Sequence, residues 1–152
     1  MNSYKTAIAR NAQPVPTRWL LNRNLIVFPV LDYGCGKCYS VNPYPWINYD
    51  PYWYKIDLDC FRGSFQTVVC NYVLCTLPKS EETAVLRDIQ SLLSCHPEAA
   101  AYITVRNDKP RSGYGKSSKG TYQRKVTLPY LLLLRKTTQY RIYRLTRNSK
   151  LV

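Results

Sequence analysis

Apolar runs of strand length alternate with helical and irregular segments in this chain, and that alternation constrains the fold more than any other feature. The clearest run is Phe65–Asn71, and Val30–Tyr33 and Ala99–Val105 share its buried-strand character. A helix is predicted after Phe65–Asn71, with Ser80 as its N-cap and apolar residues at helical spacing behind it. Because such alternation is typical of parallel βαβ units, the sequence predicts an α/β fold with a mostly parallel central sheet and helices on both faces.

Weaker elements are predicted around this framework, and the whole chain, residues 1–152, is expected to form a single domain. Two are short helices, Thr17–Arg23 and Thr127–Leu134. Three are short strands, Trp46–Tyr49, Lys55–Leu58 and Thr138–Thr146. No apolar run approaches the ~18–20 residues that cross a bilayer. No apolar stretch with a small-residue cleavage site opens the chain, so a cytoplasmic protein without membrane contact is expected. The oligomeric state stays open.

The chain has six cysteines, which we expect to be free thiols because nothing in the sequence indicates export. Cys35 and Cys38 form a C-x2-C pair that could begin a zinc site. The chain has no second such pair and only one histidine, His96, so half of a zinc ligand set is missing. We therefore predict no metal site.

The net charge of +13 is distributed unevenly. Residues 1–31 and 109–152 contain no acidic residue, and all nine acids lie between Asp32 and Asp108. Basic ends of this kind attract DNA or RNA, although they also keep a tyrosine-rich surface soluble. The candidate nucleic-acid surface is the basic loop after Ala99–Val105, with Lys109, Arg111, Lys116, Lys119, Arg124 and Lys125.

Three polar signals follow the predicted strands. The first signal lies at the end of the predicted strand Val30–Tyr33 and consists of Asp32, Gly34, Cys35 and Gly36. Glycines there would let the backbone approach a ligand closely. Asp50 ends the next strand, where a carboxylate can accept the hydroxyls of a ribose. These residues predict a nucleoside site at the carboxyl ends of the strands.

The third signal is Asn71 and Tyr72, which follow the strongest strand. They are expected above the reactive end of the nucleoside, where an amide oxygen and an aromatic face can position a reacting group or shelter a cation. A dinucleotide is less suited to the site, because its fingerprint needs a glycine where this chain has Tyr39.

Four segments together resemble the class I S-adenosylmethionine-dependent methyltransferases. Leu31–Lys37 (LDYGCGK) is similar to the family's first motif, and Asn48–Pro51 (NYDP) is similar to its acidic ribose-binding turn. Thr67–Pro78 (TVVCNYVLCTLP) is similar to its fourth strand, and Ala101–Arg106 (AYITVR) is similar to its fifth strand. Lys5–Arg10 and Gly120–Lys125 narrow the resemblance to the methyltransferase-like family associated with DNA phosphorothioation. The similarity spans residues 5–125 in islands.

The resemblance implies a reduced Rossmann-like methyltransferase fold, S-adenosylmethionine as cofactor and methyl transfer as activity. Asp32 would orient the methionine part and Asp50 would hold the ribose. Asn71 and Tyr72 would line the transfer site as catalytic residues. Asp57 or Asp59 is a weaker candidate for contact with the adenine amino group.

The chain also departs from the family pattern. A further glycine of the first motif is replaced by Cys38, and the Asn-Pro-Pro-Tyr or Asp-Pro-Pro-Tyr signature of DNA base-amino methylation is missing. Two alternatives therefore stay open beside a methyltransferase whose acceptor is nucleic acid. One is a nucleic-acid-binding protein on a catalytically degenerate methyltransferase fold, and the other is an enzyme that consumes S-adenosylmethionine without methylating.

Overall fold

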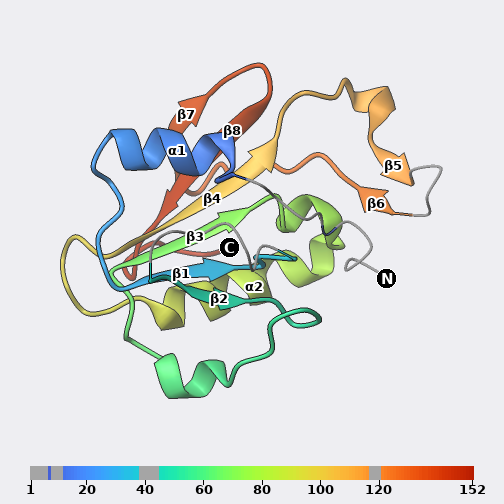
Figure 1. Cartoon of the computed structure of the whole chain (residues 1–152). Coiled ribbons are helices and arrows are strands. Elements are labelled where there is room, and N and C mark those ends of the chain that lie inside the picture. The colour runs from blue at the N-terminus through green and yellow to red at the C-terminus, as the bar shows by residue number, and fades with distance from the viewer. Residues whose placement is uncertain (1–6, 8–11, 38–44, 117–120) are drawn as a thin grey trace.

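A six-stranded sheet forms the centre of the computed structural model, which describes residues 7, 12–37, 45–116 and 121–152 (Figure 1). Its strand order is β2-β1-β3-β4-β8-β7. The strands are β1 (Val30–Tyr33), β2 (Ile47–Tyr49), β3 (Thr67–Asn71), β4 (Ala100–Arg106), β7 (Leu132–Lys136) and β8 (Tyr140–Leu145). Two α-helices accompany them, α1 (Val15–Asn22) and α2 (Lys79–Leu92).

The direction of the strands confirms the predicted α/β fold with a mostly parallel central sheet. β1 pairs in parallel with β2 on one side and with β3 on the other, and β3 pairs in parallel with β4. β8 then pairs antiparallel with both β4 and β7. Because the chain leaves β1 toward one edge and later returns to its other side, a topological switch point lies between β1 and β3. Ligands of open α/β sheets bind at such a point, beyond the carboxyl ends of the strands.

Apolar side chains form a separate cluster on each face of the sheet. Leu20 of α1 packs in one cluster with Val69 of β3. Leu86 of α2 packs in the other with Val68 of β3. Neighbouring strand residues point to opposite faces, so α1 and α2 contribute to opposite sides of the sheet. Among the described residues each cluster includes one α-helix, so the predicted cover of both faces by helices is not confirmed.

Several predicted elements differ from the structure. The helix α1 begins at Val15, two residues before the predicted start at Thr17, and its N-cap is Pro14. The N-cap of α2 is Pro78 rather than the predicted Ser80. Proline suits these positions because it has no N–H to leave unpaired and its backbone angle fits the helix start.

Two further predictions of secondary structure were wrong. The candidate strand Lys55–Leu58 is irregular and leads into a 3-10 turn, η2 (Leu58–Phe61), which Asp57 caps by accepting from the Asp59 N–H. The candidate helix Thr127–Leu134 becomes a turn followed by β7, because Leu132–Lys136 pairs with β8. The strand predicted over Thr138–Thr146 is confirmed as β8.

Among the described residues, none of the helices combines the length and the apolar character that a membrane crossing requires.

Candidate functional site

A cavity of about 690 Å³ opens at the switch point, beyond the carboxyl ends of β1 to β4. This volume lies within the ~300–1,000 Å³ of small-molecule sites. Glycines, tyrosines and carboxylates make up nine of the twenty described residues of its wall. The described lining residues are Ala7, Tyr33, Gly34, Cys35, Gly36, Tyr49, Asp50, Pro51, Tyr52, Asn71, Tyr72, Val73, Thr76, Leu77, Glu81, Val85, Arg106, Asp108, Gln123 and Gln139.

The glycine loop after β1 is held against the end of β2. The N–H groups of Gly34 and Cys35 both donate to the Tyr49 carbonyl, at 2.7 and 3.0 Å. Gly34 and Gly36 have positive φ angles of +78° and +62°, which favour glycine. A Cβ at Gly34 would overlap the Val73 side chain. The first glycine is therefore required by packing against the β3 loop, not only by the approach of a ligand.

Asp50 joins the glycine loop to its own turn. Its Oδ2 accepts from the Gly36 N–H at 3.1 Å. Its Oδ1 accepts from the N–H groups of Tyr52 and Trp53, at 2.8 and 2.9 Å. A carboxylate oxygen has two acceptor positions, so both positions of Oδ1 are used by the protein and one position of Oδ2 faces no described donor. Asp50 thus ties the glycine loop to the turn after β2 and leaves one acceptor position without a described donor.

Asn71 and Tyr72, at the end of β3, both line the cavity. The Asn71 Nδ2 donates to Thr17 Oγ1 of α1 at 2.8 Å, whereas Asn71 Oδ1 is buried and accepts from no donor among the described residues. Tyr72 has a φ of +61°, a left-handed conformation that is rare and strained for an aromatic residue. Such strain is concentrated at functional sites.

The turn after β3 is supported by a buried thiol, because Cys75 Sγ donates to the Tyr72 carbonyl at 3.2 Å. Burial raises the pKa of Cys75 to about 11, and burial also raises the pKa of Cys70 above its ordinary value of 9.0. The folded protein therefore keeps thiol protons that the unfolded chain releases near pH 9.

We expect the free energy of unfolding to be unaffected by these thiols below about pH 9 and to fall as the pH rises from about 9 to 11. The fall should reach up to ~1.4 kcal/mol per pH unit for each thiol. Urea unfolding at pH 7, 9 and 10 measures it. Cys75→Ala should flatten the decline, and an equally steep decline in that variant would show that Cys75 does not cause it.

Three of the nine acids of this basic chain line the cavity: Asp50, Glu81 and Asp108. One guanidinium, Arg106, lines it as well, and its Nε and Nη2 donate to the two carboxylate oxygens of Asp108 at 2.9 and 2.7 Å. Three carboxylates against one guanidinium give these residues a net charge of minus two. The cavity is thus electrostatically suited to a cation, although the chain as a whole is strongly positive.

The cavity wall includes polar residues that were not predicted from the sequence. Gln123 Oε1 is buried there, and the described residues offer it no hydrogen-bond donor. Glu81, Arg106 and Asp108 also line the cavity. Arg106 and Asp108 directly follow the predicted strand Ala99–Val105, so their position at a strand end was the available signal.

Other predicted residues lie outside the cavity wall. Asp32 is in β1, where alternation directs it to the face of the sheet that carries α1. Asp57 caps η2, and Asp59 forms an ion pair with Arg62 at 3.2 Å. None of these three carboxylates is among the described lining residues.

One predicted nucleic-acid contact has an internal role. Arg124 Nη2 lies 2.6 Å from Glu82 Oε2 and its Nε donates to the Leu77 carbonyl at 2.6 Å, with little exposure of either charged side chain. Lys109 is half-buried, and Arg111, Lys116 and Lys125 are exposed. Lys119 lies outside the described residues.

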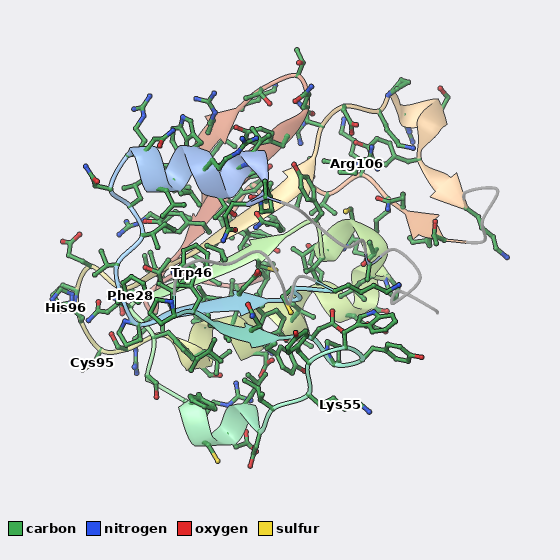
Figure 2. The ribbon with its side chains drawn as sticks, viewed as in Figure 1. Phe28, Trp46, Lys55, Cys95, His96 and Arg106 are labelled. Carbon is green, nitrogen blue, oxygen red and sulfur yellow. The ribbon has the colours of Figure 1, made fainter. Side chains whose placement is uncertain are left out.

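The described part of the chain contains no cluster of three or more side chains that could hold a metal ion. Cys38 lies outside the described residues. Figure 2 shows His96 and Cys95 at the end of the sheet opposite Arg106. His96 precedes β4, and its Nδ1 accepts from the Glu98 N–H at 3.1 Å. The five described cysteines, Cys35, Cys60, Cys70, Cys75 and Cys95, are free thiols.

Comparison with known proteins supports the fold class. No family model matches the chain, and no curated protein matches it in sequence. A solved structure described as "Conversion of a Disulfide Bond into a Thioacetal Group during Echinomycin Biosynthesis" is similar, with a TM-score of 0.53 and 16% identity. The similarity covers 91% of this chain and 84% of that chain. At this identity the likeness concerns the fold alone, and together with the strand order it is consistent with a Rossmann-like α/β fold.

Proposed function

We propose that this protein is an S-adenosylmethionine-dependent methyltransferase that binds its cofactor in the switch-point cavity. One observation carries the proposal. Asp50, at the end of β2, accepts a hydrogen bond from the Gly36 N–H of the glycine loop and has a further acceptor position at the cavity. The similar solved structure comes from work on a biosynthetic conversion, which favours an enzyme over a purely binding protein.

The cavity suits the chemistry of this cofactor. S-adenosylmethionine carries a sulfonium, an ammonium and a carboxylate, and its net positive charge complements the acidic lining. The buried oxygens Asn71 Oδ1 and Gln123 Oε1 accept no hydrogen bond from the described residues. The hydroxyl and amino groups of the cofactor are donors that could supply one. Asp50 Oδ2 would hold one ribose hydroxyl, because its other acceptor position is used by Gly36. The side chains of Tyr49 and Tyr52 line the cavity and would cover the adenine.

The bound cofactor supplies an activated methyl group, and the protein has to align an acceptor with it. Alignment alone provides much of the acceleration of an in-line displacement, so no acid–base pair is required. The strained Tyr72 turn fixes the position of its ring at the cavity wall. Asn71 Oδ1 would hold an N–H or O–H of the acceptor, with Thr17 keeping the amide oriented.

Cys35 and Gly36 would contact the cofactor from the loop, since both line the cavity. Asp32 of β1 does not line the described cavity wall, so it would act on the cofactor only through the glycine loop or a water. The narrower resemblance, to the methyltransferase-like family associated with DNA phosphorothioation, remains a prediction.

Calorimetry with S-adenosylmethionine and S-adenosylhomocysteine tests the cofactor assignment directly. We expect saturable binding of both compounds by the unmodified protein, at one site per chain. Failure of both to bind would contradict the assignment.

Product analysis then separates the functional alternatives. Methyl transfer to added DNA or RNA should release S-adenosylhomocysteine in step with methyl incorporation. A non-methylating enzyme would consume the cofactor without incorporation, and a degenerate binding protein would leave it intact.

A further inference from the structure

The fold brings the two acid-free ends of the chain together on one face. The helix α1 belongs to residues 1–31, and β7 and β8 belong to residues 109–152. Leu20 of α1 packs in the same cluster as Tyr140 and Ile142 of β8, and Figure 1 shows α1 beside the β7–β8 hairpin. Two segments far apart in the sequence thus form a continuous surface to which neither contributes an acid.

Two arginines of this surface, one from each segment, lie against the same aromatic ring. The guanidinium carbons of Arg23 and Arg135 lie 4.9 and 4.8 Å from the centre of the Trp19 ring. Arg18 is exposed on α1, one residue before Trp19. Arg144 lies two residues beyond Ile142, on the same face of β8. We call Arg18, Trp19, Arg23, Arg135 and Arg144 the arginine face.

None of these arginines forms an ion pair with an acidic residue in the part of the chain that the structure describes. The four ion pairs formed by described residues involve Arg62, Arg106 and Arg124, and none includes the arginine face. Arg135 Nε donates to the Tyr140 hydroxyl at 3.1 Å, which leaves its terminal nitrogens available. The positive charge is therefore not neutralised within the described protein.

We propose that the arginine face binds nucleic acid through its phosphates. A guanidinium presents paired donors that match phosphate oxygens, and stacking on Trp19 orders two of them before binding, which lowers the entropy cost. The exposed side chain of Leu132, opposite Arg144 in the β7–β8 register, adds an apolar contact for sugars or bases at the margin.

The surface also adjoins the cavity. Thr17, in the first turn of α1, receives the hydrogen bond from Asn71, which lines the cavity wall. A strand bound along α1 would therefore reach the rim where the proposed methyl transfer takes place. Binding to the arginine face does not require the cofactor, so the inference goes beyond the proposed function and can be tested separately from it.

The test is fluorescence anisotropy with labelled single-stranded DNA, single-stranded RNA and duplex DNA across a salt series. The unmodified protein should bind at low salt, and Arg23→Gln/Arg135→Gln should lower the salt slope by about 1.4–1.8, at ~0.7–0.9 per phosphate contact. The matched control, Lys109→Gln/Lys116→Gln, removes the same charge from the loop after β4 and should change the slope less.

Thermal melting and calorimetry with S-adenosylmethionine show whether each variant stays folded and keeps its cofactor site. If Arg23→Gln/Arg135→Gln is unstable, Arg18→Gln/Arg23→Gln provides the same test on the exposed surface of α1. Equal losses in the arginine and lysine variants would overturn the proposal, because charge alone would then explain binding. Absence of oligonucleotide binding at low salt, or binding to anionic phosphatidylserine vesicles instead, would overturn it as well.

Discussion

Asp50→Ala is expected to weaken S-adenosylmethionine binding by about 1.5–3 kcal/mol, or roughly 10- to 150-fold, the range for loss of hydrogen bonds to a charged group. Two physical effects combine in this variant. The acceptor position that would hold a ribose hydroxyl disappears, and the N–H groups of Gly36, Tyr52 and Trp53 lose their acceptor. Calorimetry gives the loss of affinity, and thermal melting gives the accompanying loss of stability.

Asp50→Asn separates these two effects. The amide oxygen can still accept from Tyr52 and Trp53, whereas the amide nitrogen in place of Oδ2 can accept neither from Gly36 nor from a ribose hydroxyl. We expect a smaller loss of stability than in Asp50→Ala and a comparable loss of affinity. Asp57→Asn is the matched control, because Asp57 also caps a turn but does not line the cavity. Normal cofactor affinity in folded Asp50→Asn would remove Asp50 from the binding site.

Asp50 also illustrates how far sequence reasoning extends. Its place at the end of β2 followed from the run Trp46–Tyr49 and from the spacing to the glycine loop, and the strand is confirmed as Ile47–Tyr49. The three backbone donors to its carboxylate depend on how the chain folds back at Tyr52 and Trp53, and no periodicity encodes that geometry. The position was therefore predictable, and its structural role was not.

Strand pairing explains the clearest error in secondary structure. Pro129 and the apolar residues after it suggested the first turn of a helix, but Leu132–Lys136 gains its backbone hydrogen bonds from β8 instead. Leu132 and Leu133 remain exposed on this edge strand, so burial did not decide the outcome. Pairing with the neighbouring strand of the hairpin outweighed local propensity here, as is common for strands.

Charge in the sequence was similarly ambiguous. Arg124 and Lys125 are neighbours in a basic segment, yet Arg124 is paired with the buried Glu82 and Lys125 is exposed. The meeting of Arg23 with Arg135 at Trp19 likewise depends on the packing of α1 against the C-terminal hairpin. Sequence composition indicated the excess of positive charge, whereas the tertiary fold decided which cations stay available.

Gly34→Ala is expected to destabilise the protein severely, by about 2–5 kcal/mol. A left-handed conformation costs a residue with a Cβ about 1–2 kcal/mol, and overpacking adds about 1–3 kcal/mol. The added Cβ would overlap the Val73 side chain, so both costs apply. Cofactor binding should weaken together with stability, because the loop carries both Gly34 and Gly36 into the cavity wall. Urea unfolding and calorimetry measure the two effects.

A second glycine isolates the backbone part of this cost. Gly63 has a φ of +72°, close to that of Gly34, but a Cβ there would meet nothing within 4 Å. Gly63→Ala should therefore show only the conformational cost of about 1–2 kcal/mol. Adding Val73→Ala to Gly34→Ala should remove the overlap and bring the double variant close to Gly63→Ala, after correction for Val73→Ala alone. If Gly34→Ala is no less stable than Gly63→Ala, Val73 is not what requires glycine at this position, and the loop is free to move away from β3.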